Sequence, residues 1–304
     1  MAFRDSDFDE FSTLIGKALG KWEMTDGQRD MLAAMNGHGA LRPELYLSDI
    51  PARRRLSQLL QKHGRRGVDR RQMEGELYFL TFAEDCGVTS DRTPHLAVKR
   101  LRGKVDRAAR MMGVSMIAMM EIQSIANHPR RGDGRTLLLN VHAIAITKSP
   151  NKMRRAMKKI NMSRAWRVAL GILPVHRKKA GRTKADARRM FAYIAKVPTD
   201  AKNLMQNKRK PGRHLLMPTK AGYRPELALR IQEGLSQIRI YDVLFTTGPR
   251  LRAIRLAVKR ELAQWHEARQ KRNPSNVIDF DAAKAWETLR QVNGSKKLRP
   301  YVIV

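Results

Sequence analysis

The spacing of apolar residues predicts helices at both ends of the chain. In residues 1–70, apolar positions recur every three or four residues, which is the period of a helix with one buried face. Residues 48–51, Ser-Asp-Ile-Pro, supply a capping acceptor and a first-turn proline, so they predict the start of a further helix. Residues 223–247 and 249–270 keep the same helical rhythm.

The middle of the chain alternates apolar runs with basic helical segments. Strands are predicted at 77–82, 114–125, 135–147 and 163–175. Helices are predicted at 94–113, 150–161 and 183–197, and turns or loops at 126–135, 176–182 and 199–222. This order predicts an α+β protein with a central ferredoxin-like βαββαβ antiparallel sheet, helices on one of its faces, and helical N- and C-terminal regions.

The same pattern divides the chain into four regions. They are a helical basic N-terminal region (1–72), the central sheet domain (73–200), a helical basic C-terminal region (201–270) and a polar tail (271–304). The helix after residue 51 is compatible with a DNA-docking helix of a helix-turn-helix-like unit and equally with a solvated basic face.

Charge indicates the kind of partner. The chain has 61 Lys and Arg against 28 Asp and Glu, a net charge of +33. A chain this basic is best neutralised by a polyanion, and nucleic acid binds such proteins through counterion release from its phosphates. Ribosomal or nucleoid-coating proteins share this composition, so charge alone selects no function.

Cysteine content and hydropathy indicate the compartment. Cys86 is the sole cysteine, so one chain can form neither a disulfide framework nor a cysteine-based zinc site. No apolar run approaches the roughly 20 residues that span a bilayer, and the acidic first residues lack a signal-peptide core. We therefore expect a cytoplasmic, nucleoid- or plasmid-associated protein with no membrane contact.

Polar residues interrupt two of the predicted strands. Asn140 and His142 lie two apart, so their side chains share one face. Glu121 lies on the preceding strand, close enough in a hairpin for side chains about 5 Å apart. Burying a lone carboxylate is costly, but an imidazole and Mg²⁺ or Mn²⁺ would offset that cost. The alternative is a core histidine with its hydrogen bonds satisfied.

Tyr193 and Lys196 lie three apart on a predicted helix, so they share a face. A tyrosine hydroxyl can attack phosphorus when a nearby cation favours its phenolate. The alternative is a tyrosine ring packed on the sheet beside a lysine that extends to solvent.

Taken together, these motifs resemble those of the HUH-type endonucleases, in particular the rolling-circle replication initiators of plasmids and small viral genomes. The resemblance covers roughly residues 75–200. It rests on an aromatic-apolar first strand (Phe79-Leu80-Thr81-Phe82), a metal strand (Asn140-Val141-His142) and a Tyr-x-x-Lys helix (Tyr193-Ile194-Ala195-Lys196).

The resemblance implies a metal-dependent endonuclease and strand transferase. Tyr193 would attack a phosphate of single-stranded DNA, leaving a 5′-phosphotyrosyl link and a free 3′-OH, while Lys196 screens charge. His142, Asn140 and Glu121 would hold Mg²⁺ or Mn²⁺. The family normally has histidine at both ends of the metal triplet, so Asn140 either ligates through its amide oxygen or marks an altered site.

The implied partner is DNA, with a single-stranded nick site and flanking duplex, and a homo-oligomer is compatible with the sequence. The basic clusters predict phosphate contacts at Arg53, Arg54, Arg55, Arg130, Arg131, Arg135, Lys178, Lys179, Arg182, Lys208, Arg209 and Lys210. Two alternatives stay open: a non-catalytic nucleic-acid-binding protein on the same fold, and a basic structural nucleoid-type protein.

Overall fold

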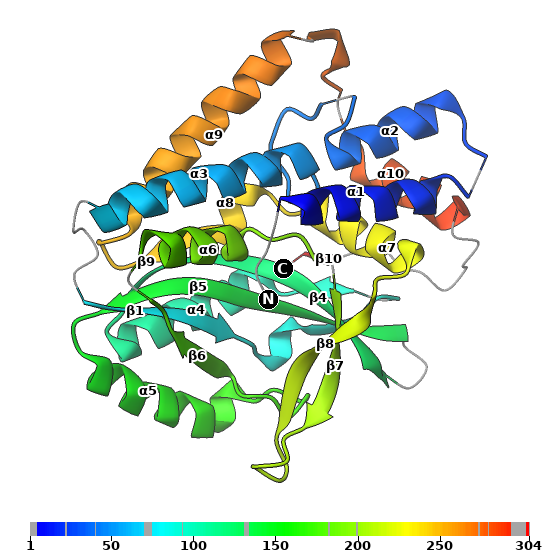
Figure 1. Ribbon diagram of the computed structural model, residues 1–304. Helices are drawn as coiled ribbons and strands as arrows, with labels where there is room; N and C mark the ends of the chain where they lie inside the picture. Colours follow the sequence, from blue (N-terminus) through cyan, green and yellow to red (C-terminus); the bar gives the residue numbers. More distant parts are fainter. Residues whose placement is uncertain are drawn as a thin grey trace.

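A mixed β-sheet forms the centre of the computed structural model (Figure 1). The structure describes residues 5–21, 23–39, 41–69, 75–92, 94–130, 134–181, 183–198, 200–272, 274–278, 280–292 and 302–303. Within these ranges the main sheet has the strand order β6-β1-β5-β4-β7-β8, with β2 also paired to β5 and β9 to β4. Its strands are β1 (Glu76–Phe82), β2 (Val88–Ser90), β4 (Ser115–Arg130), β5 (Gly134–Thr147), β6 (Val175–Lys179), β7 (Asp200–Gln206), β8 (His214–Gly222) and β9 (Leu244–Thr247). A parallel pair joins β3 (His95–Leu96) to β10 (Val302–Ile303).

Helices cover both faces of the sheet. They are α1 (Ser6–Leu19), α2 (Asp26–Asn36), α3 (Ile50–Asp69), α4 (Val98–Met112), α5 (Pro150–Met162), α6 (Lys184–Ile194), α7 (Pro225–Leu235), α8 (Ile240–Val243), α9 (Arg252–Arg272) and α10 (Ala282–Val292). Short 3₁₀ turns are η1 (Asp85–Gly87), η2 (Arg164–Trp166) and η3 (Pro274–Asn276). Figure 1 shows α4 and α5 on one face, and α6 with α3 above it on the other. The mixed α+β class is therefore confirmed. The two helices within the expected βαββαβ segment, α4 and α5, share one face, while α3 and α6 cover the other.

The antiparallel hairpin of β4 and β5 lies at the centre of this arrangement. Its register places Glu121 opposite Asn140 and Met119 opposite His142. From Leu137 to Thr147 every residue of β5 is buried, because helices cover both faces and strands flank both edges. The apolar run at 135–147 is thus a central strand, as its pattern predicts.

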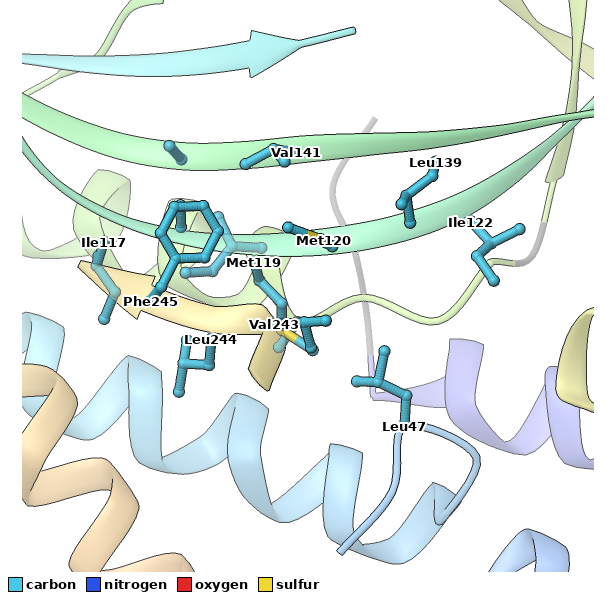
Figure 2. Close-up of a cluster of buried hydrophobic side chains, with 14 of the residues drawn as sticks. Leu47, Ile117, Met119, Met120, Ile122, Leu139, Val141, Val243, Leu244 and Phe245 are labelled. Atoms are coloured by element: carbon cyan, nitrogen blue, oxygen red, sulfur yellow. The ribbon is translucent and has the colours of Figure 1, made fainter. Parts of the chain in front are cut away.

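One hydrophobic cluster connects the sheet with helices from both ends of the chain, including α1, α3, α7 and α9. Figure 2 shows a portion of it between the sheet and α3. The labelled side chains are Leu47, Ile117, Met119, Met120, Ile122, Leu139, Val141, Val243, Leu244 and Phe245.

The predicted strand at 163–175 is wrong. Residues 164–166 form η2, and the paired strand β6 begins only at the last residue of that prediction, Val175, and continues into the segment predicted as a basic turn. Strand β6 lies at the edge of the sheet, where β1 is its pairing partner within the described ranges. An edge strand can keep basic side chains in solvent while its backbone completes the ladder, so hydropathy does not identify it.

Other boundaries also differ from the prediction. The expected loop at 199–222 contains the hairpin β7–β8, and the expected loop at 126–135 is mostly taken up by β4 and β5. The single helix expected at 223–247 is instead α7, the short α8 and strand β9. Strand β9 adds its Leu-Phe-Thr-Thr segment to the edge of β4, where aromatic and β-branched side chains pack well.

Candidate functional site

The predicted site residues converge on the face of the sheet that α6 covers. Glu121 is the register partner of Asn140, and Thr81 of β1 is the register partner of His142. Because side chains alternate along strands, all of these residues point to one face. Helix α6 begins with a capping box between Thr183 and Asp186 and places its last turn over this face.

Glu121 is the centre of a buried charge network. One carboxylate oxygen lies 2.7 Å from His142 Nε2 and the other lies 3.0 Å from Lys196 Nζ. The Glu121 side chain is only 3% exposed. Burial opposes its ionisation, but the Lys196 ammonium and the His142 contact outweigh burial and lower the pKa of Glu121 to about 2. The carboxylate is therefore ionised at neutral pH.

His142 is held as a neutral imidazole. Burial lowers the pKa of its ring, and the attraction of Glu121 offsets only part of that effect. A 2.7 Å contact with an ionised carboxylate then requires the ring proton on Nε2. Thr81 Oγ1 lies 3.2 Å from Nδ1 and donates its hydroxyl proton there. The ring is buried, as the core-histidine alternative expects, and neutral, as a metal ligand must be.

Tyr193 packs against the same aromatic group. Its ring meets Phe79 edge-on at 5.1 Å between centroids and His142 at 5.4 Å. Phe79 and His142 stack at 5.4 Å, and Lys196 Nζ lies 4.7 Å from the centre of the Tyr193 ring. The Tyr193 ring is thus packed on the sheet, as the alternative interpretation expects. The side chain is half-buried and borders a cavity, so a ligand can also reach it.

Lys196 is predicted to lie on the helix at 183–197, but it lies outside it. Helix α6 ends at Ile194, and Ala195 caps it, so Lys196 lies in the following segment. The Arg53 guanidinium of α3 donates to the Lys196 carbonyl oxygen and so holds this segment to α3. Burial lowers the pKa of Lys196, but Glu121 and Tyr193 outweigh that effect and raise it, so the ammonium is retained.

The expected phosphate contact of Arg53 is not compatible with its position. The side chain is 2% exposed, and burial lowers its pKa to about 10 although the charge of Glu121 opposes this. Arg53 is a positioning residue that connects α3 to the site. The arginine cluster at 53–55 does not by itself show which arginine is buried and which contacts a ligand. The partner of Arg53 is a backbone carbonyl far away in the sequence, so no local pattern indicates it.

A cavity of about 520 Å³ opens in front of Tyr193. Its lining includes Phe79, Thr81, His176, Lys178, Arg189 and Tyr193. The predicted contact residues Lys178 and Lys179 both border it, as does His176, which the sequence suggests as a residue flanking the site, whereas no ligand contact is predicted for Thr81 or Arg189. The two-residue alternation from Phe79 to Thr81 is the signal that could place Thr81 on this face. His176 and Arg189 lie there only because β6 and α6 come together.

Among the described residues, none of the remaining basic candidates lines this cavity. Arg54 pairs with Asp9, and Arg55 borders a hollow between α3 and α9. Arg135 is the second residue of β5, and its backbone amide donates to Asp91 Oδ1 at 2.7 Å. Lys208, Arg209 and Lys210 are exposed at the tip of the β7–β8 hairpin. Arg130 ends β4, whereas Arg131 and Arg182 fall outside the described residues.

The donor set for a metal is small but chemically suitable. Across the described residues, no group of three or more His, Cys, Asp or Glu side chains is placed to hold a metal. The third donor would be Asn140, whose buried Oδ1 has no hydrogen-bond partner within the described part of the chain. An amide oxygen, a carboxylate and an imidazole fit a hard divalent cation. Such an ion would have to share Glu121 with Lys196.

Comparisons with protein-family profiles, curated proteins and solved structures find no match to this chain. The function is therefore argued from the site alone. In the described ranges, no helix has the length and apolar character needed to cross a membrane.

Proposed function

We propose that this protein nicks and rejoins single-stranded DNA as a replication initiator or a related mobile-element protein, with Tyr193 as its nucleophile. The proposal includes a ferredoxin-like core of the HUH type. The strand order β6-β1-β5-β4 supports it, because α4 connects β1 to β4 and α5 connects β5 to β6, as a βαββαβ sheet requires.

The convergence of four groups from separate elements carries the proposal. Tyr193 from α6, Lys196 from the segment after it, His142 from β5 and Glu121 from β4 are in mutual contact. A cavity of about 520 Å³, lined by His176, Lys178, Lys179 and Arg189 among others, opens beside the tyrosine. Tyr193 lines this cavity, and His142 and Lys196, which contact its ring, connect it to the buried Glu121 carboxylate. A buried ionised group beside a cavity is typical of a functional site.

In the proposed reaction, Lys178 and Arg189 draw a DNA phosphate into the cavity. Tyr193 Oη attacks phosphorus, so a phosphotyrosyl bond forms and the bond to the 3′ oxygen breaks. The phenol proton passes to solvent, and the 3′ oxygen takes up a proton and leaves as a free hydroxyl. Attack by a 3′-OH on the phosphotyrosyl link reverses these changes and rejoins a strand.

His142, Glu121 and Asn140 would hold Mg²⁺ or Mn²⁺ in this reaction. The ion would polarise the scissile phosphate. For His142 to ligate through Nε2, its ring proton must move to Nδ1. The Nδ1–H group can then donate a hydrogen bond to Thr81 Oγ1. Lys196 positions the Tyr193 ring, and it balances the charge of Glu121 with or without the ion.

The test is a nicking assay on single-stranded oligonucleotides from the origin region of the replicon that encodes the protein. We expect a covalent protein–DNA adduct on a denaturing gel with Mn²⁺, loss of the adduct with EDTA, and loss in Tyr193→Phe. Tyr241→Phe is the matched control, because Tyr241 lies on α8, outside this cavity. An adduct that survives in Tyr193→Phe would refute the assignment of the nucleophile.

A non-catalytic DNA-binding protein is the second candidate. One observation favours it: Lys196 already neutralises the Glu121 carboxylate at 3.0 Å, so the buried charge is balanced without a metal. This candidate predicts DNA binding without an adduct across all origin strands and metals.

A further inference from the structure

The β7–β8 hairpin has two chemically different faces. Leu204 and Leu216 are register partners, and both pack against a small buried cluster. The cluster consists of Ala83, Ile125, Leu138, Val168 and Leu170. This inner face attaches the hairpin to the rest of the molecule.

The outer face of the hairpin is apolar and exposed. Met205 is the register partner of Leu215, and Met217 follows two residues later on the same face. These side chains are 51%, 44% and 49% exposed. They are three of the six large apolar side chains that are exposed in the described part of the chain. A concentration of this kind marks a binding surface more often than chance.

Basic residues accompany this apolar face. Residues 201–222 contain Lys202, Lys208, Arg209, Lys210, Arg213 and Lys220, and no aspartate or glutamate. Lys208, Arg209 and Lys210 are exposed in the turn (Figure 1). A polyanion is therefore the partner of complementary charge.

Hydrogen bonds attach the hairpin to β4 and close its turn. Asn127 of β4 donates to the Leu204 carbonyl at 2.9 Å and accepts from the Leu204 amide at 2.6 Å. At the tip, the Asn207 amide donates to the Arg213 carbonyl at 2.8 Å, and Gly212 adopts a positive φ of 77°. The basic turn and the apolar face are thus presented in a fixed relation to each other.

We propose that the β7–β8 hairpin is a duplex-DNA-binding arm. Its basic turn contacts phosphates, and Met205, Leu215 and Met217 pack against base edges and sugars in a groove. A two-stranded ribbon fits the major groove of B-DNA, which is about 12 Å wide, and the nine residues of β8 extend roughly 30 Å at about 3.3 Å each. The arm is separate from the Tyr193 cavity, so it would hold the duplex that flanks a processed site.

The test is fluorescence anisotropy with a labelled 30-base-pair duplex over a series of salt concentrations. We expect the triple variant Lys208→Ala, Arg209→Ala, Lys210→Ala to weaken binding and to reduce the slope of log K against log salt by about 2 to 3, at about 0.9 per lost phosphate contact. The matched control replaces Lys152, Lys158 and Lys159, which are exposed on α5. It should reduce the salt slope less than the hairpin variant does.

The apolar face has its own variant. We expect Met205→Ser, Leu215→Ser, Met217→Ser to lower duplex affinity at least tenfold with an unchanged salt slope, because no phosphate contact is lost. The control replaces Met111, Met162 and Leu256, which are similarly exposed elsewhere, and should bind as the wild type does. Thermal unfolding verifies that every variant is folded.

The proposal is overturned if both hairpin variants bind duplex DNA as the wild type does. It is also overturned if the apolar variant changes only self-association, or only binding to anionic vesicles or to duplex RNA. The result is separate from that of the nicking assay: hairpin variants should still form the Tyr193 adduct on short single strands, and Tyr193→Phe should keep its duplex affinity.

Discussion

Replacing Lys196 with methionine tests the buried charge network most directly. The substitution keeps the volume of the side chain but removes the ammonium that lies 3.0 Å from Glu121 Oε1. Moving the pKa of Glu121 from 4.5 to about 2 corresponds to about 3 kcal/mol of folding free energy, at roughly 1.4 kcal/mol per pKa unit. We expect Lys196→Met to cost about 3 to 5 kcal/mol at neutral pH, because it leaves a buried carboxylate without its strongest partner.

The pH dependence of this loss has a definite sign. In the wild type the pKa of Glu121 is depressed, so its contribution is present above pH 4.5 and is lost as the pH falls toward 2. In Lys196→Met, burial dominates and raises the pKa of Glu121 above its ordinary value. The variant should therefore lose stability as the pH rises, and its deficit should be larger at pH 8 than at pH 5.

Urea unfolding followed by circular dichroism at both pH values measures this deficit. The double variant Lys196→Met, Glu121→Gln is the control, since it removes the uncompensated charge and should recover most of the loss and abolish its pH dependence. A Lys196→Met protein as stable as the wild type at pH 8, or a deficit that does not change with pH, would refute the reasoning.

Three further outcomes follow from the same contacts. Tyr193→Phe should change the free energy of unfolding by less than about 1 kcal/mol, measured by urea unfolding, because the ring contacts remain and only a hydroxyl is lost. Gly64→Ala should destabilise by about 1 to 3 kcal/mol, since the added Cβ would lie 2.2 Å from the Phe191 ring. Gly103→Ala on α4 should instead stabilise by up to about 1 kcal/mol, since the added Cβ would lie 3.9 Å from Arg107 Nη1, an ordinary contact. Mn²⁺ should raise the melting temperature of the wild type in a concentration-dependent way, and Asn140→Ala should weaken that effect; an equal shift in the variant would contradict ligation by Asn140.

The local pattern of the sequence predicts several elements correctly. The strand at 135–147 is recognisable because its apolar run is long and bounded by turn residues. The helix from Pro150 is recognisable because serine and proline mark its start. The shared face of Asn140 and His142 follows from the two-residue repeat of any strand. These features depend on neighbours within a few residues, so the sequence alone determines them.

Tertiary structure decides the rest. The basic edge strand β6 and the hairpin β7–β8 lack a strong apolar run. Strand β6 gains its hydrogen bonds from β1, and the strands of the hairpin pair with each other and join the sheet through β4. Lys196 meets Glu121, and Arg53 meets the Lys196 carbonyl, only after α3, α6 and β4 have packed together. Burial of these charges makes their pairing strong, and burial is a property of the assembled core rather than of any short segment.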